Sequence, residues 1–140
     1  MGTPHTPQVL PAPTVYPDNQ HFWAQAELGR LVLPRCTTCG DVHWFPRPIC
    51  PFCGGTQMQW QAAAGLGTIY SVSVTRKAGP APYAIAFVTL DEGVTLLTHI
   101  VEGDLDTVRI GERVSLLFAP TDGGPPVPVF RRLSSSGVMP

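Results

Sequence analysis

The residues of this chain that are best suited to chemistry are four cysteines, which occur as two pairs. In each pair two residues separate the cysteines and a glycine follows the second one: Cys36-Thr-Thr-Cys39-Gly40 and Cys50-Pro-Phe-Cys53-Gly54. Two thiolates of one such turn can reach a single ion, and the glycine tolerates the positive φ that lets main-chain N–H groups point at sulfur. Two facing turns would supply four sulfur ligands in a tetrahedron, as in a closed structural zinc site. The spacing therefore predicts a metal site without an open position for catalysis.

Other uses of the cysteines fit the sequence less well. Disulfides form in oxidising compartments, and no charged start followed by an apolar segment predicts secretion here. A redox pair of the thioredoxin type needs a strand–helix–strand context that the sequence lacks. Iron also accepts four sulfur ligands, and the two turns resemble those of rubredoxins, but residues 41–49 form a much shorter insert than in that pattern. We therefore expect structural zinc, with iron as the alternative after heterologous expression, and we do not expect His43 to be a ligand.

Length and composition limit the classes of protein that could carry such a site. The chain has 140 residues, which is one ordinary domain or two very small ones at about 150 residues per domain. Its 44% apolar residues exclude disorder throughout, and no apolar run reaches the ~18 residues that span a membrane. Only 14% of the residues are charged, against roughly 25% on average, and the net charge is −1. We therefore expect a cytoplasmic protein whose weakly charged surface contacts a partner.

The two ends of the sequence are predicted to be loose. Residues 1–17 contain five prolines and almost no charge, which favours a disordered, Pro-rich tail. Residues 134–140 begin with three serines and a glycine, which favours a second loose end.

One helix is predicted, over residues 18–29. Asp18 or Asn19 can cap its free N–H groups, and Gly29 suits its left-handed end. Phe22 and Trp23 lie on its apolar face. Because so short a helix is not stable alone, this face must dock on the protein's own core or on a partner.

The second half of the chain predicts five short strands. They show period-two alternation or short apolar runs between turn residues, at 68–76, 83–90, 94–101, 112–118 and 127–133. A short loop ending in Gly93 joins the second and third as a hairpin, and the polar connector 103–109 with one short helical turn precedes the fourth. This order predicts a small Greek-key barrel of the OB type, with a small sandwich as the alternative. The predicted division is a tail at 1–17, a helix and ribbon at 18–60, a barrel at 61–133 and a tail at 134–140.

Motifs of common catalytic sites are missing from the sequence. It contains no G-x-S-x-G nucleophile elbow, no G-x-x-x-x-G-K phosphate loop and no H-E-x-x-H motif. The four histidines are scattered over the tail, the helix, the segment between the cysteine pairs and one strand: His5, His21, His43 and His99. The chain is therefore not expected to be an enzyme on its own.

Taken in order, the motifs resemble one known family. The order is a short helix with Phe22 and Trp23, the first cysteine pair, Phe45-Pro46-Arg47, the second pair, and Gly65-x-Gly67-Thr68-x-Tyr70-Ser71 at the entry of the barrel. It is similar to the acyl-CoA-associated zinc-ribbon plus OB-fold family, formerly a domain-of-unknown-function family, over residues 18–133. The resemblance implies a mainly β fold: a short N-terminal helix, a rubredoxin-like zinc ribbon and a five-stranded OB-fold barrel.

The resemblance also implies a function. Members of that family are partner subunits of thiolase-superfamily enzymes and steroid side-chain aldolases, and others act beside MaoC-like enoyl-CoA hydratases. By resemblance we expect a non-catalytic subunit that docks a thiolase-fold enzyme in a 2:2 heteromeric complex and shares its acyl-CoA substrate. The first choice of partner is a lipid-transfer-protein-type retro-aldolase that cleaves steroid side-chain CoA esters; a thiolase or acyltransferase, and then a hydratase, follow.

A rival class is a nucleic-acid-binding module, because zinc ribbons and OB barrels also serve that role. The chain has only 9 lysine and arginine residues, and its basic doublets form no stripe along the sequence, which disfavours this class.

Seven residues outside the metal site are candidates for contacts with CoA or with the partner. Three cations could meet CoA phosphates, and the alternative is that they are ordinary solvated charges: Arg47, Arg76 and Lys77. Four aromatic residues could meet the partner, and the alternative is packing within this chain: Phe22, Trp23, Trp44 and Phe45.

Overall fold

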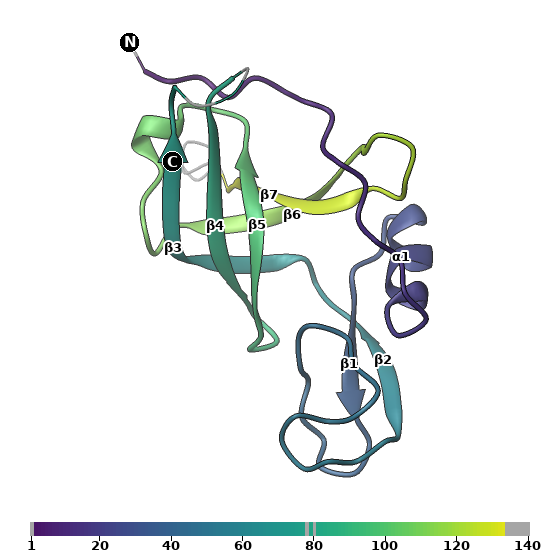
Figure 1. The fold of residues 1–140 in the computed structure, drawn as a ribbon. Coiled ribbons are helices and arrows are strands. Elements are labelled where there is room, and N and C mark those ends of the chain that lie inside the picture. Colours follow the sequence, from purple (N-terminus) through teal and green to yellow (C-terminus); the bar gives the residue numbers. More distant parts are fainter. Residues whose placement is uncertain (1, 78, 80, 134–140) are drawn as a thin grey trace.

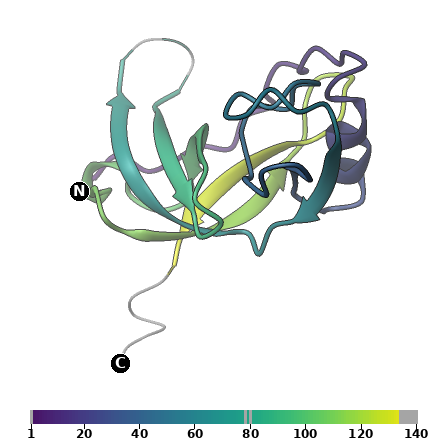
Figure 2. The same ribbon diagram turned by 90° about the horizontal axis from the view of Figure 1, so that it is seen from below.

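A computed structural model describes residues 2–77, 79 and 81–133 of the chain. Its described part consists of a β-barrel, a two-stranded hairpin with long loops, and one α-helix (Figure 1). Seen from below, the barrel lies on one side and the hairpin with the helix on the other (Figure 2). The predicted mainly β fold, with a short helix and a cysteine-bearing ribbon before a five-stranded barrel, is confirmed.

The barrel closes through five strands in the order β3-β4-β5-β7-β6. Their bounds are β3 Leu66–Thr75, β4 Tyr83–Leu90, β5 Thr95–Val101, β6 Arg113–Ala119 and β7 Val127–Arg132. All neighbours are antiparallel except β5 and β7, which pair in parallel over only two residue pairs. The expected helical turn in the connector is the short 3-10 helix η1, Leu105–Thr107. The barrel is closed, so the small sandwich that the strand pattern also allowed is excluded.

Strands β4 and β5 show how the sequence positions the barrel core. Directly opposed residues alternate between inward pairs, such as Val88 and Leu96, and outward pairs, such as Phe87 and Leu97. The inward residues are buried, as period-two geometry requires when one face meets the core. The outward row is mixed, with Thr89, Thr95 and His99 beside the exposed apolar residues Phe87 and Leu97.

The ribbon begins from a hairpin of β1, Val32–Cys36, and β2, Met58–Ala62, which pair antiparallel from Val32 and Ala62 to Cys36 and Met58. Helix α1, Gln20–Glu27, packs beside β1 and buries its apolar side chains in the same cluster as the barrel core. The base of the ribbon therefore shares the core of the barrel, while the chain between Cys36 and Met58 extends away from it (Figure 1).

The ends of α1 agree with the sequence in part. The helix stops before Gly29, whose φ of +77° is the predicted left-handed conformation. Asn19 is the N-cap residue, but its side chain does not cap a helical N–H group. Its Oδ1 instead accepts a hydrogen bond of 2.7 Å from the main-chain N–H of Tyr16, so Asn19 stabilises the turn that precedes the helix.

The N-terminal segment, residues 2–17, follows an extended path over one end of the barrel (Figure 1). The main-chain N–H of Thr3 donates to Asp104 Oδ1 at 2.8 Å, and the N–H of His5 donates to the carbonyl of Gly103 at 3.0 Å. Further along, the carbonyl of Leu10 accepts from the N–H of Asp122 at 2.9 Å. A disordered tail would make none of these bonds, so the structure differs here from the expectation. The second predicted tail, 134–140, lies outside the described residues.

Among the described helices, none has the length and hydrophobicity needed to cross a membrane.

Candidate metal centre and the surfaces beside it

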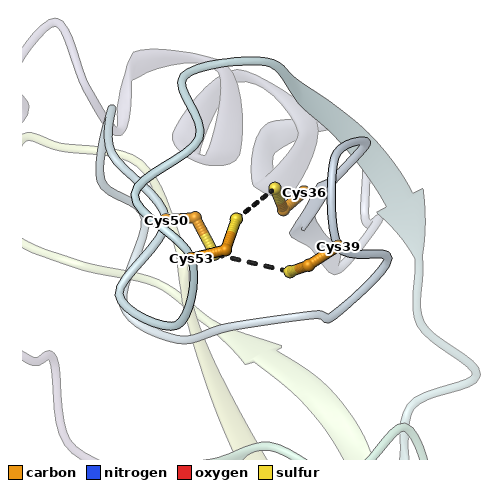
Figure 3. A group of neighbouring side chains, drawn as sticks. All are labelled: Cys36, Cys39, Cys50 and Cys53. Atoms are coloured by element: carbon orange, nitrogen blue, oxygen red, sulfur yellow. Dashed lines mark hydrogen bonds between the residues drawn. The ribbon is translucent and has the colours of Figure 1, made fainter.

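The four cysteines meet at the end of the ribbon (Figure 3). Cys36 is the last residue of β1, and the two loops between β1 and β2 carry the others. All four sulfur atoms lie within 4.8 Å of one another, and Cys36 and Cys50 are buried while Cys39 and Cys53 are exposed. The two predicted pairs therefore come together in one cluster.

The spacing of the sulfur atoms fits a tetrahedral metal site. The Sγ atoms of Cys36 and Cys53 are 3.6 Å apart, and those of Cys39 and Cys50 are 3.7 Å apart. A disulfide bond would bring sulfur atoms to about 2.05 Å. Four sulfurs at about 2.3 Å from one zinc ion lie about 3.8 Å apart along the edges of the tetrahedron. The four cysteines are thus positioned to bind a metal ion with no disulfide between them.

Main-chain N–H groups in both turns point at the sulfur atoms. The N–H of Phe52 donates to Cys50 Sγ and that of Gly55 to Cys53 Sγ, each at 3.4 Å. In the absence of metal, main-chain N–H groups, that of Cys39 first, lower the pKa of the Cys36 thiol to about 6 against burial, while burial and the neighbouring sulfur atoms raise the pKa of Cys39 to about 12 and also that of Cys53. Such donors favour the deprotonated ligand that a metal requires.

The glycines that follow each pair serve the turn rather than the sulfur directly. Gly40 and Gly54 have φ of +84° and +78°, which favours glycine because it lacks a Cβ atom. Their N–H groups donate to the carbonyls of Cys36 and Cys50, at 2.8 Å and 3.0 Å. The positive φ was predicted, but the sulfur-directed N–H groups belong to neighbouring residues.

His43 lies apart from the four-sulfur cluster, as the sequence led us to expect. Its side chain is buried, and neither ring nitrogen has a hydrogen-bond partner among the described residues. Burial lowers the pKa of His43, and the neighbouring Arg47 guanidinium lowers it further. Both causes favour a neutral ring, and His43 lines a hollow between the ribbon and the turn before β5.

The four candidate aromatic residues lie close together but differ in exposure. Phe22 and Trp23 are only 1% and 8% exposed and pack edge to face with ring centroids 4.8 Å apart. Trp44 is half-buried with its ring 4.9 Å from that of Phe22, while Phe45 is exposed beside it. The structure thus places the helix aromatics in the protein's own core and leaves Phe45 at the surface.

The three candidate cations do not form one cluster. Arg76 and Lys77 directly follow β3 in the barrel, whereas Arg47 lies in the ribbon between β1 and β2. The guanidinium of Arg76 is engaged in an ion pair with Asp106 at 2.6 Å. Arg47 donates from Nε to the carbonyl of Phe45 at 3.3 Å and has no carboxylate partner among the described residues.

Sequence reasoning did not single out several exposed apolar side chains near the ribbon. Phe52 lies inside the second cysteine pair, and Phe87 and Leu97 point outward from β4 and β5. The continuous apolar character of both strands was the available signal. It could not tell which side chains a barrel turns outward.

Two family models match this chain in succession. The first, described as ChsH2, rubredoxin-like zinc ribbon domain, matches residues 23–59. The second, described as ChsH2, C-terminal OB-fold domain, matches residues 60–119. The border between them falls within β2, the second strand of the ribbon hairpin.

Three curated proteins illustrate the sequence similarity. A probable enoyl-CoA hydratase alpha subunit of Thermomonospora curvata is 36% identical over 92% of this chain, which spans 42% of that protein's length. A DUF35 domain-containing scaffold protein of Methanothermobacter thermautotrophicus is 34% identical, over 60% of this chain and 68% of its own. Benzoylsuccinyl-CoA thiolase subunit BbsA of Geobacter metallireducens is 29% identical, over 61% of this chain and 60% of its own.

A solved structure matches the fold and most of the length. The structure titled "Ltp2-ChsH2(DUF35) aldolase" contains a chain with a TM-score of 0.77 and 35% sequence identity. The match covers 86% of the present chain and 98% of that chain.

Proposed function

The chain belongs to the DUF35 family, with the zinc ribbon and OB-fold domains of ChsH2, and from this membership we propose that it is a non-catalytic subunit of an acyl-CoA-processing enzyme complex. The proposed partner is a thiolase-superfamily enzyme, which carries the catalytic residues. The complex is proposed to be cytoplasmic and to contain two copies of each subunit.

One observation carries this proposal. At 35% identity the chain aligns with 98% of a chain in a structure whose title joins Ltp2 and ChsH2(DUF35) in an aldolase. That relative is thus one named component of a two-component enzyme. Three further relatives that match part of this chain are named scaffold proteins, which agrees with an accessory role.

The chemistry of the described residues agrees with an accessory role. The cysteines fill a closed site, so a metal bound there would have no free position for water or substrate. We propose that the ion is zinc and that it holds the ribbon loops in place. Binding to nucleic acid is disfavoured, because four arginines of the barrel and its connecting loop already face carboxylates: Arg76, Arg113, Arg131 and Arg132.

The proposed reaction of the complex is retro-aldol cleavage of a steroid side-chain CoA ester. In that reaction a β-hydroxyacyl thioester loses the bond between its α and β carbons. The aldolase title supports this choice over thiolysis, which the name of the thiolase subunit BbsA would favour. Hydration of an enoyl-CoA is the third candidate, because the hydratase alpha subunit is similar over 92% of this chain.

The proposal is tested by reconstitution. The tagged full chain is used to isolate its partner from the native host, and the partner is then identified by mass spectrometry and purified separately. We expect no turnover of acyl-CoA esters by the chain alone, and activity when the thiolase-superfamily partner is added. Three substrates distinguish the candidate reactions: a β-hydroxyacyl-CoA, a β-ketoacyl-CoA with free CoA, and an enoyl-CoA.

The outcomes separate the classes of function. Turnover by the lone chain would contradict the role of an accessory subunit. Retention on heparin with a steep salt dependence, without any thiolase-superfamily partner, would favour the nucleic-acid class instead.

A further inference from the structure

The N-terminal segment is attached to the barrel at two places. At the first, the N–H of Thr3 donates to Asp104 Oδ1 at 2.8 Å. At the second, the carbonyl of Leu10 accepts from the N–H of Asp122 at 2.9 Å. Residues 6–9, which lie between these two places, make no main-chain hydrogen bond to the described part of the chain. The segment therefore crosses the barrel surface as a bridge that is fixed on both sides (Figure 1).

A hollow of about 320 Å³ lies between this bridge and the barrel. Val9 borders it on the side of the segment, while Val101, Leu117 and Val129 border it from β5, β6 and β7. Val129 is only 2% exposed, yet it does not belong to the buried cluster of the barrel core, which contains its neighbour Phe130. Because successive side chains of a strand point to opposite faces, Val129 is buried on the outer face of the barrel, beside the hollow.

The walls of this hollow are mostly apolar and carry no unbalanced charge. Of the thirteen residues that border it, nine are apolar and four are polar, namely His5, Gln8, His99 and Glu102. Burial lowers the pKa of His5 and of His99, which favours neutral rings near pH 7. The carboxylate of Glu102 lies 3.8 Å from the guanidinium of Arg131. A charged group of a ligand would therefore find no free opposite charge in these walls.

The two histidines give the hollow its capacity for hydrogen bonding. A neutral imidazole has one N–H donor and one acceptor nitrogen, so it can bind a hydroxyl group or donate to a carbonyl oxygen. No hydrogen bond to a described residue contributes to the pKa of either ring. His99 belongs to β5, which holds it in place, whereas His5 belongs to the N-terminal segment. The walls thus suit a hydrocarbon body with one uncharged oxygen function.

The size of the hollow limits its occupant to a small molecule or to the end of a larger one. Its volume of about 320 Å³ is at the lower end of the range for ligand sites, which is about 300–1,000 Å³. At the roughly 30 Å³ that a water molecule occupies in the liquid, it holds on the order of ten non-hydrogen atoms. A second protein chain would have to displace the N-terminal segment, which is bonded to the barrel on both sides.

We propose that this hollow, hereafter the bridged hollow, binds an uncharged hydrocarbon group of about ten non-hydrogen atoms with one hydroxyl or carbonyl oxygen, which hydrogen-bonds to His99. The inference does not rest on the proposed function, because a single chain forms the bridged hollow. Such a group can come from a free alcohol or ketone, or it can be the acyl end of a thioester.

The experiment measures dissociation constants of the full chain at pH 7 by NMR titration. The probes share a chain of eight carbons and differ in their polar group: 1-octanol, octanoate, octylammonium and octanoyl-CoA. We expect 1-octanol to bind with a dissociation constant of about 1 mM or below and to shift the methyl signals of Val101, Leu117 and Val129. Octanoate and octylammonium should bind at least about 10-fold more weakly, because their charges would be buried without a partner.

Octanoyl-CoA distinguishes the two sources of the ligand. If it shifts the same methyl signals as 1-octanol, the bridged hollow takes the acyl group of a CoA ester. If 1-octanol binds there and octanoyl-CoA does not, the ligand is a free molecule. Both results support the proposed chemistry of the site.

Two substitutions test the location of the site. Ala119→Phe places a ring in the hollow and should weaken binding of 1-octanol at least about 10-fold, because Ala119 borders the hollow from β6. His99→Phe keeps a ring but removes both nitrogen atoms, and it should weaken binding roughly 3- to 10-fold. The matched controls are Ala24→Phe and His21→Phe, at exposed positions of α1, and both should stay within about 2-fold of the unaltered chain. Circular dichroism and metal content reveal any folding defect; should Ala119→Phe not fold, His99→Phe and the methyl shifts still test the site.

Several results would overturn the proposal. The chemical class is wrong if octanoate or octylammonium binds as tightly as 1-octanol, and the role of His99 is wrong if His99→Phe binds like the unaltered chain. The site is wrong if no probe binds saturably, or if Ala119→Phe folds and binds 1-octanol unchanged. If the chain dimerises and Ala119→Phe abolishes the dimer, a second copy covers the hollow instead. In each of these cases the proposed function still stands if a thiolase-superfamily partner binds the chain, so the two proposals fail separately.

Discussion

The ribbon loops and the barrel of this molecule are stabilised in different ways. Between Cys36 and Met58 only His43, Pro46 and Cys50 are buried, so this stretch has almost no apolar core of its own. The barrel instead encloses large, fully buried side chains such as Phe130. A bound metal can replace a core in a short segment, because the free energy of binding the ion becomes free energy of folding.

The two regions also differ in how they handle charge. All four ion pairs of the described residues join residues of the barrel and its connecting loops, whereas Arg47 in the ribbon is without a carboxylate among the described residues. The comparison teaches that the barrel is stabilised by buried side chains and ion pairs, whereas the ribbon loops depend on the four-cysteine site. Loss of the metal should therefore unfold the ribbon loops and leave the barrel folded.

The largest effect is expected from removing one metal ligand. Cys36→Ser should abolish metal binding, unfold residues 37–57 and eliminate partner binding, because a structural zinc site contributes about 10–16 kcal/mol to folding. Metal content is measured by mass spectrometry, and hydrogen exchange is followed for the ribbon and the barrel separately. The amides of β4 and β6 should stay protected.

Thr37→Ser, a change at an exposed neighbour of Cys36, is the control and should keep the metal. A Cys36→Ser variant that lacks metal, keeps its ribbon amides protected and still binds the partner would contradict the conclusion that the metal keeps the ribbon folded.

The second largest effect is expected from removing a buried side chain of the barrel. Phe130→Ala should cost about 3–5 kcal/mol of unfolding free energy, because it leaves a cavity among fully buried side chains. Denaturant unfolding measures the loss, and metal content of the folded protein should not change. Phe52→Ala, the same substitution at a residue that is 63% exposed, should cost less than about 0.5 kcal/mol. Equal losses for both variants would contradict the conclusion that buried side chains such as Phe130 stabilise the barrel.

Much of the fold could be predicted from the sequence because local signals agreed with the global structure. The period-two alternation and the turn before Gly93 correspond to β3, β4 and β5, and the paired cysteine spacing corresponds to the four-sulfur cluster. These features depend on neighbours in the sequence. The four ligand positions are encoded almost completely by their spacing.

The surface beside the cluster was harder to predict. Whether Phe22 packs inward or Phe45 outward depends on how α1 and the ribbon settle on the barrel, which no local pattern encodes. The N-terminal segment was missed for a similar reason, since its hydrogen bonds reach partners about a hundred residues away, such as Asp104 for Thr3. The ion pair of Arg76 with Asp106 could not be predicted from the sequence either, because the two residues are far apart along the chain.

A smaller effect is expected where the N-terminal segment meets the barrel. Asp104 Oδ1 accepts from the N–H groups of Thr3 and Asp106, at 2.8 and 3.0 Å, so Asp104→Ala should cost about 1 kcal/mol and speed hydrogen exchange at residues 3–5. Asp122→Ala is the control, because Asp122 contacts Leu10 through its main chain and should keep that bond. Unchanged exchange at residues 3–5 in the Asp104→Ala variant would show that the segment is not held by this carboxylate.

The smallest effect concerns the pH dependence of the barrel, and its sign follows from one ion pair. Arg113 donates to both carboxylate oxygens of Asp91, at 2.7 and 2.9 Å, and this lowers the pKa of Asp91 in the folded protein. The stabilisation is therefore present above the unfolded pKa of about 3.9 and is lost as the pH falls through the lower folded value. Both side chains are 43% exposed, so the effect on stability is small.

Amide exchange in β6 is compared between the unaltered chain and Asp91→Asn from pH 6 down to pH 3, after correction for the intrinsic pH dependence of exchange. The protection of the two proteins should differ at pH 6 and converge below pH 4. The ribbon cannot serve as the reporter, because its thiolates gain protons and release the metal as the pH falls. If the difference instead grew toward low pH, the ionised carboxylate of Asp91 would be destabilised in the folded state. The ion pair with Arg113 would then not stabilise the barrel.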